Sequence, residues 1–244
     1  MIRVIQTKDY EEMSRRAASL VQAQILLKPD AVLGLPAGRT PIGTYEELIR
    51  MNRAGMLDFS GVRTVNLDEY MGLAPAHVQS FRYFMDSTLF TRINIDPMNT
   101  FVPDGCARDA AKSCEAYDAL IRSLGGIDLQ LLGIGHNGHI GFNEPDEAFI
   151  AGTHVVELTE DTLRANASLF PDPDQMPRQA VTMGMGAIMH ARRILLIANG
   201  VGKAKALRAA IEGPVTPKVP ASILQLHPDV TLFVDEAAAS LLSK

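Results

Sequence analysis

Short runs of continuous apolar residues alternate along this chain with longer segments in which apolar residues recur every three or four positions. The short runs suit strands buried on both faces of a parallel sheet, and the long segments suit helices that cover it. We expect strands at Arg3–Gln6, Ala31–Leu35, Val62–Asn66, Leu129–Ile134, His154–Glu157, Ile194–Ala198 and Thr231–Val234. We expect helices at Tyr10–Leu27, Thr44–Ala54, Ser80–Leu89, Ala107–Ser123, Glu160–Phe170, Gly184–His190 and Lys203–Glu212. This order predicts an α/β fold with a doubly wound, mostly parallel sheet and helices on both faces, as in Rossmann-like proteins.

A single domain accounts for the whole chain, residues 1–244. A length of 244 residues with 47% hydrophobic side chains can bury one sizeable core, and no repeat or long linker divides it. The stretch Pro171–Pro177, which is rich in Pro and Asp, is expected to be a surface loop within that domain.

Charge and hydropathy exclude several classes of partner. The net charge is −5 and no basic run occurs, which argues against binding to nucleic acid or to an anionic membrane. No apolar run reaches the roughly 18 residues that a membrane span needs, and the N-terminus turns polar too early for a signal peptide. Cys106 and Cys114 form no CxxC pair and are expected to be reduced thiols. We therefore expect a cytoplasmic protein that binds a small molecule.

The candidate functional residues cluster in four segments. In a doubly wound sheet, ligands bind beyond the carboxyl ends of the strands. The segments that directly follow expected strands and are rich in glycine or in ionisable groups are 35–41, 67–70, 133–139 and 199–203.

The segment GLPAGRTP at 34–41 follows one strand and opens a helix. Its glycines allow a tight turn, and the free N–H groups at a helix start attract an anion such as phosphate. Lys203, at the start of another helix, could be the second arm of a phosphate clamp. An ordinary strand-to-helix turn and a solvated lysine remain the alternatives at this point. The glycine–lysine ending of a P-loop is absent.

The segment NLDEY at 66–70 places Asp68 and Glu69 side by side at the end of a strand. Neighbours in an extended chain face opposite ways, so only one of the two carboxylates need enter a cleft. An Asp with the ordinary pKa of about 3.9 is ionised at neutral pH and can take a proton from the carbon next to a carbonyl. The alternative is a solvated acidic turn, which the apolar neighbours disfavour.

Two binding motifs are rejected for residues 133–145, which we call the histidine loop because they contain His136 and His139. Residues 133–138 match GxGxxG, and Glu157 lies about 20 residues further on, as a dinucleotide fingerprint requires. A glycine and a proline follow, however, where that fingerprint needs a helix. A metal site made of His136, His139 and Glu144 is also disfavoured, because their loop lacks the helical register of known zinc motifs.

Acid–base chemistry suits the histidine loop better. An imidazole titrates near neutral pH, so it can both take and give a proton. Its second ring nitrogen needs an orienting partner, which Asn137 or Glu144 could provide. The alternative is a purely structural histidine.

These motifs together resemble those of the glucosamine-6-phosphate deaminases. The resemblance rests on GLPAGRTP (34–41), NLDEY (66–70), GHIGFNEP (138–145), THVVELTEDTLRANASLF (153–170), GKAKALRAAIEGPV (202–215) and PASILQLHP (220–228). They cover almost the whole chain in the family's order.

The resemblance implies one α/β domain, without cofactor or metal, that converts glucosamine 6-phosphate and water to fructose 6-phosphate and ammonia. It implies that His139 opens the sugar ring, with Asn137 and Glu144 as its relay. It also implies that Asp68 takes the proton from C2 and returns one to C1. The residues expected at the phosphate are Gly38, Arg39, Thr40 and Lys203.

Several positions depart from the family pattern. Asn137 stands where some members have Asp, and Ser168 stands where the family usually has an arginine that helps to hold the phosphate. The usual loop TGGTP or TGSTP reads AGRTP here, which puts Arg39 at the expected phosphate site. We expect Arg39 to compensate for the missing arginine. The alternative is that Arg39 points to solvent or pairs with Glu46 or Glu47.

Longer family members respond to N-acetylglucosamine 6-phosphate at subunit contacts. The corresponding positions here are Asp146, His154, Val156 and Glu157, which are poor hosts for a phosphate, and the C-terminal extension of those members is absent. We expect hyperbolic kinetics and prefer a monomer.

Three alternative functions remain. Galactosamine 6-phosphate differs from the glucosamine ester at one ring hydroxyl, and the sequence leaves this choice open. A 6-phosphogluconolactonase of similar fold is disfavoured by NLDEY together with GHIGFNEP. A non-enzymatic sugar-phosphate sensor is disfavoured because Asp68, His139 and Glu144 are all present and no helix-turn-helix precedes residue 31.

Overall fold

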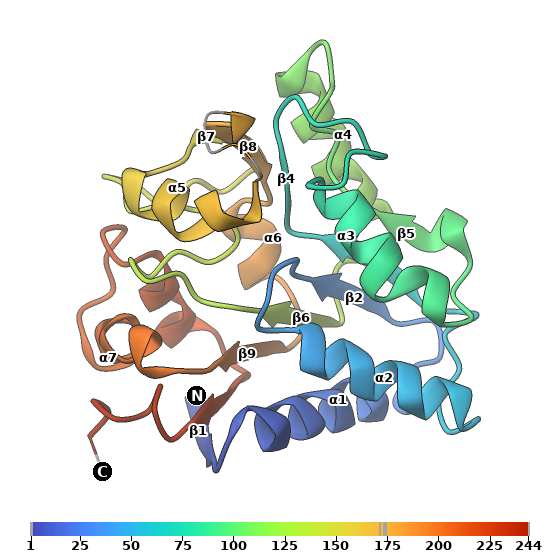
Figure 1. The fold of residues 1–244 in the computed structure, drawn as a ribbon, viewed down its shortest axis with the longest axis horizontal. Coiled ribbons are helices and arrows are strands. Elements are labelled where there is room, and N and C mark those ends of the chain that lie inside the picture. The colour runs from blue at the N-terminus through green and yellow to red at the C-terminus, as the bar shows by residue number, and fades with distance from the viewer. Residues whose placement is uncertain (1, 171, 173–174, 244) are drawn as a thin grey trace.

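The computed structural model describes residues 2–170, 172 and 175–243. Its main element is a seven-stranded parallel sheet in the order β1-β10-β9-β6-β2-β3-β5 (Figure 1). The strands are β1 (Ile2–Thr7), β2 (Val32–Leu35), β3 (Arg63–Asn66), β5 (Thr100–Phe101), β6 (Leu129–Leu132), β9 (Ile194–Ala198) and β10 (Val230–Asp235). The predicted doubly wound α/β fold is confirmed.

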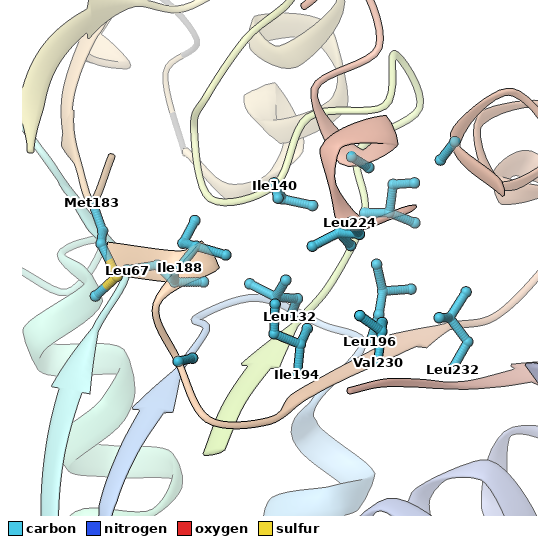
Figure 2. Close-up of a cluster of buried hydrophobic side chains, with 14 of the residues drawn as sticks. Leu67, Leu132, Ile140, Met183, Ile188, Ile194, Leu196, Leu224, Val230 and Leu232 are labelled. Carbon is cyan, nitrogen blue, oxygen red and sulfur yellow. The ribbon is translucent and has the colours of Figure 1, made fainter. Parts of the chain in front are cut away.

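Helices cover both faces of this sheet. Successive strand residues face opposite ways, so the apolar residues of each strand need cover on both faces. Leu195 packs in a core with α1 (Tyr10–Leu27), α2 (Ile42–Arg53) and α3 (Phe81–Thr88). Its neighbour Leu196 packs in the opposite core with α4 (Ala110–Ser123), α6 (Met185–Met189) and α7 (Ala204–Glu212). Figure 2 shows the second core, where Leu132 and Leu196 of the sheet lie below Ile140 and Leu224.

Local capping decides where several helices begin. Asp9 accepts a hydrogen bond from the N–H of Glu12 at 2.8 Å and starts α1. Thr159 caps α5 (Glu160–Asn166) through the N–H of Thr162. The helix predicted at Glu160–Phe170 therefore begins as expected, but it ends at Asn166 and continues as a 3-10 helix. The 3-10 helices are η1 (Phe90–Arg92), η2 (Pro97–Asn99), η3 (Ala167–Leu169), η5 (Val201–Lys203) and η6 (Pro220–Leu226).

A second, antiparallel sheet has the order β4-β8-β7, with β4 at Asp68–Tyr70, β8 at Gln179–Thr182 and β7 at His154–Glu157. The expectation that His154–Glu157 belongs to the parallel sheet is wrong. The strand forms, but it pairs with β8 and is only partly buried. β4, β5 and β8 have no counterpart among the predicted strands. β4 and β5, with three and two residues, are too short to show a period.

The loop predicted at Pro171–Pro177 falls in part on residues 171, 173 and 174, which lie outside the described residues.

The chain order creates a switch point between β2 and β6. From β2 the chain continues to β3 and β5 on one side, and from β6 it continues to β9 on the other side. The loops that follow β2 and β6 therefore diverge at the carboxyl edge of the sheet. Such a point is where ligands bind in open α/β sheets.

Candidate active site

The loop between β2 and α2 is held in place by a tyrosine of α1. The hydroxyl of Tyr10 donates to the carbonyl of Thr40 at 3.1 Å and accepts from the N–H of Gly43 at 2.8 Å. Gly38 has a φ of 114°, which side-chain-bearing residues rarely adopt. Residues 36–41 line a cavity of about 330 Å³. The loop thus brings the positive dipole end of α2 beside this cavity.

Arg39 extends from this loop toward η3, which follows α5. Its Nη2 donates to Oγ of Ser168 at 3.2 Å. The alternative partners are engaged elsewhere, because Glu46 accepts from Arg92 and Glu47 accepts from Arg50. The guanidinium of Arg39 therefore lies beside Ser168, the position at which the family usually has an arginine and this chain does not.

Lys203 reaches the same cavity from the loop after β9. Asp235, at the end of β10, accepts hydrogen bonds from the N–H of Gly200 at 2.9 and 3.0 Å and from the N–H of Ala238 at 2.7 Å. These bonds fix the turn that leads into η5. Burial lowers the pKa of the Lys203 amine from its usual value.

Asp68 and Glu69 face opposite ways, as the extended geometry predicts. Asp68 lines the cavity and is only 7% exposed. Glu69 turns away and accepts from the N–H groups of Tyr70, Phe81 and Arg82 at 2.9, 2.8 and 2.9 Å. It fixes the start of α3, so only Asp68 is available to a ligand.

The protonation of Asp68 differs from the sequence expectation. Burial, and secondarily the charge of Glu69, raise its pKa to about 8. The carboxyl is therefore protonated at neutral pH in the ligand-free chain, where an ionised group was expected. The physical reason is the low-dielectric surrounding of the side chain, which disfavours the charged form.

The loop after β6 contains no helix, which agrees with the rejection of the dinucleotide fingerprint. Its glycines make room for an imidazole instead. A Cβ on Gly135 would lie 2.4 Å from Nε2 of His139, so the ring occupies the space that a side chain would fill. Gly141, with a φ of 57°, brings the chain back toward Asp68.

Glu144 joins Asn137 and His139 in one hydrogen-bonded relay. Its Oε2 accepts from Nδ2 of Asn137 at 2.6 Å and lies 3.2 Å from Nδ1 of His139. Thr162 donates to the other oxygen, and Oδ1 of Asn137 accepts from the N–H of His139 at 3.1 Å. Burial opposes ionisation of Glu144, but these bonds outweigh it and lower its pKa to about 2. The carboxylate can only accept, so Nδ1 of His139 carries the proton and Nε2 is left free.

An aromatic wall closes the cavity on one side. The ring of Tyr70 lies 4.8 Å from that of Phe81 and 5.6 Å from that of Phe142, and the ring of His139 meets Phe142 edge-on at 6.1 Å. These rings surround Asp68 and His139 with apolar surface, which strengthens electrostatic interactions inside the cavity.

The structure brings together the residues that the sequence assigned to catalysis and to phosphate binding, whereas Glu69 turns away. Gly38, Arg39, Thr40, Asp68, Asn137, His139 and Lys203 line one cavity, and Glu144 is bonded to two of them. The sequence reasoning missed Thr159 and Thr162, which hold Glu144, and the wall around Tyr70. The helix cap at Thr159 was the one local signal that could have indicated the first two.

Neither a membrane span nor a metal centre is found in the part of the chain that the structure describes. No helix there is long and apolar enough to cross a bilayer. No three His, Cys, Asp or Glu side chains of the described residues are grouped so as to hold a metal ion.

Comparison with known proteins adds sequence relatives over the full chain. The family described as glucosamine-6-phosphate isomerases/6-phosphogluconolactonase matches residues 7–233. A glucosamine-6-phosphate deaminase of Lachnoclostridium phytofermentans is 57% identical over 95% of this chain and 98% of its own length. One of Clostridium perfringens is 55% identical over 99% of this chain and 100% of its own length.

Solved structures give the same picture. A monomeric glucosamine-6-phosphate deaminase matches with a TM-score of 0.96 and 47% identity, over 98% of this chain and 99% of that one. A 6-phosphogluconolactonase from Leishmania guyanensis matches over 100% of both chains with a TM-score of 0.76, but with 22% identity. The second likeness shows a shared fold alone.

Proposed function

The chain belongs to the family of glucosamine-6-phosphate isomerases and 6-phosphogluconolactonases, and we propose that it is the enzyme that converts glucosamine 6-phosphate and water to fructose 6-phosphate and ammonia. The observation that carries the proposal is the pairing of two proton-transfer groups on one cavity. Asp68 lines this cavity, and so does His139, which is bonded to Glu144. An isomerase needs both, because opening the ring and moving a proton between carbons are separate steps.

The relatives support the deaminase over the lactonase. The curated relatives named above are 55% and 57% identical and carry the deaminase name, whereas the lactonase of known structure is 22% identical.

In the proposed ring-opening step, His139 acts through its free Nε2. It takes the proton of the anomeric hydroxyl and delivers one to the ring oxygen. The ionised Glu144 holds the imidazole through Nδ1 and stabilises its positive charge in between. Asn137 fixes Glu144 and the backbone of His139 at the same time.

In the proposed isomerisation step, Asp68 takes the proton from C2 of the open-chain aldehyde and returns it to C1. Over the same step O1 of the aldehyde gains a proton and the ammonium nitrogen loses one. The intermediate is an enolamine, and the product of reprotonation is an imine at C2. Water adds to that carbon and ammonia leaves, which gives the ketose. The ammonium group of the bound substrate favours ionisation of Asp68, because an opposite charge nearby lowers the pKa of a buried carboxyl.

The phosphate end of the substrate is assigned to the loop after β2 and to Lys203. Residues 36–41, which include Arg39 and Thr40, line the cavity together with Lys203. With the phosphate fixed there, C1 and C2 are held near Asp68 and His139, which is the positioning that proton transfer requires. We place the reaction in the cytoplasm, where Cys106 and Cys114, both free thiols here, stay reduced.

The proposal is tested by assaying the purified chain with four compounds. Glucosamine 6-phosphate should yield ammonia and fructose 6-phosphate in equal amounts, and unphosphorylated glucosamine should react far more slowly. A faster reaction of galactosamine 6-phosphate would change the assigned sugar. Release of acid from 6-phosphogluconolactone without any ammonia from the amino sugars would overturn the proposal.

A further inference from the structure

His136 is an ionisable side chain of the cavity to which the reaction above gives no role. It belongs to the loop after β6, is exposed and lines the cavity. Its Nε2 lies 3.1 Å from the point that a Cβ on Gly202 would occupy. The imidazole therefore packs directly against η5, the 3-10 helix that carries Lys203.

The ionisable groups around His136 come from its own loop and from three further elements, which are η5, α5 and the loop after β2. Lys203 approaches from η5, Asp161 from α5, and His139 from the same loop, and all three act on its titration. Arg39 lines the same cavity from the loop after β2. Asp161 shares its charge with Arg164 in an ion pair of 2.6 Å. The cavity is thus lined by Arg39, Lys203 and an imidazole, a set of side chains that suits an anion of more than one charge.

Without a ligand, this surrounding disfavours the protonated form of His136. The charge of Lys203, followed by burial, lowers the pKa of the imidazole. A phosphate ester brings between one and a half and two negative charges at neutral pH. Bound between Lys203 and His136, it would reverse the sign of the local field and favour the protonated ring.

We propose that His136 is a third side-chain ligand of the substrate phosphate, beside Arg39 and Lys203, and that it takes up a proton when the phosphate binds. The inference rests on the proposed function in one respect only, which is the identity of the sugar attached to the phosphate. The phosphate contact itself needs only the cavity and its three basic side chains.

The pH dependence follows from the direction of the change. A base that binds a proton more tightly in the complex contributes its full affinity below the pKa of the free protein. That contribution is lost as the pH rises through the pKa of the complex. Substrate affinity should therefore fall with rising pH above neutrality, and this fall should require His136.

The test is proton uptake on ligand binding, measured by titration calorimetry at pH 7 in two buffers of different ionisation enthalpy. The ligands are inorganic phosphate and fructose 6-phosphate, a sugar phosphate that carries no ammonium group. The variants are H136Q, which cannot be protonated, and H136R, which is always charged. The control is H190Q, since His190 is exposed at the end of α6 and lies outside the cavity.

Wild type and H190Q should take up the same number of protons per bound ligand. That number should exceed the number for H136Q by up to one. Proton exchange by the phosphate itself is common to all forms and cancels. H136Q should bind both ligands about three- to tenfold more weakly, as expected for the loss of one charge-assisted contact. H136R should keep wild-type affinity or exceed it, and should show no additional proton uptake. A merely structural histidine would not be rescued in this way.

Equal proton uptake by wild type and H136Q, or equal affinities at pH 7, would overturn the inference. So would failure of both ligands to bind to the wild-type protein. The deaminase assay on the same preparation keeps the two proposals apart. Ammonia release with unchanged proton uptake in H136Q would remove His136 from the site and leave the proposed function standing. Proton uptake through His136 without ammonia release would support His136 as a phosphate ligand and contradict the proposed function.

Discussion

The carboxyl of Asp68 carries a proton in the ligand-free chain at neutral pH, because burial beside Glu69 raises its pKa to about 8. The residue could be picked out from the sequence by its place after a strand, but its protonation could not. Burial is a property of the assembled cavity, in which Asp68 and the residues of the loop after β6 come from distant parts of the chain. The same holds for Glu144, whose ionisation depends on a relay that crosses to α5.

The raised pKa predicts the acid limb of the pH profile. Asp68 must be ionised to act as a base, so kcat/KM should rise with pH through the region of about 8 in the wild type. Replacing Glu69 with Gln removes one cause of the raised pKa, and the limb should move to lower pH. Ionisation of the substrate is the same for both enzymes, so their difference reports the protein. An unmoved limb in a variant of unchanged Tm would show that Asp68 is not the titrating group.

Arg39 gives a second prediction at this scale. Its bond to Ser168 places its guanidinium where a phosphate arginine at position 168, in η3, would act. Arg39→Gly should raise KM for glucosamine 6-phosphate by roughly tenfold, as for a lost charge-assisted contact, and should change kcat less. Adding Ser168→Arg to that variant should restore KM. If Arg39→Gly has the KM of the wild type, the compensation is wrong and Lys203 with the loop amides suffices.

At the scale of elements, the small antiparallel sheet decides the geometry at Asp68. β4 is too short to be recognised in the sequence, yet its pairing with β8 sets Asp68 opposite Thr182. The hydroxyl of Thr182 then accepts from the N–H of Phe142 at 3.0 Å and ties the histidine loop to the same sheet. This arrangement depends on pairing between distant segments, which local periodicity does not encode.

Gly141 is the tightest point of this junction and supplies a third prediction. A Cβ there would lie 2.9 Å from Oγ1 of Thr182 and 3.5 Å from Oδ2 of Asp68, at a φ of 57°. Gly141→Ala should lower kcat by at least tenfold and lower the free energy of unfolding by about 1–3 kcal/mol. The matched control is Gly55→Ala, which has a φ of 70° with nothing within 4 Å and lies after α2. Equal loss of kcat in both variants would mean that backbone strain, and not crowding of Asp68, is responsible.

For the molecule as a whole, the parallel sheet and its two helical layers were predictable because each signal is local. The run of five buried residues in β9 identifies a strand without knowledge of its neighbours, and the N-cap at Asp9 marks the start of α1. The contact between Arg39 and Ser168 joins residues 129 positions apart, and nothing local indicates it. The single domain for residues 1–244 stays a prediction.

The fourth prediction concerns regulation of the whole molecule. A second cavity, of about 200 Å³, lies beyond Glu144 and is lined by Asp146, His154, Val156 and Glu157. Its two additional acids oppose binding of a phosphate ester. We expect hyperbolic kinetics, no activation by N-acetylglucosamine 6-phosphate, and a monomer in analytical ultracentrifugation. A Hill coefficient well above one that this compound reduces would contradict the expectation.

The proposed mechanism depends most on the transfer of the C2 proton by Asp68, and hydrogen exchange measures that step directly. Wild type and Asp68→Asn are incubated with glucosamine 6-phosphate in D₂O, and NMR follows deuterium at C2 of the recovered substrate and at C1 of the product. Binding of fructose 6-phosphate to each form shows that the cavity is intact. We predict deuterium incorporation by the wild type and a rate at least about a hundredfold lower in the variant, as expected when a general base is removed. Incorporation by Asp68→Asn at the wild-type rate would contradict the account.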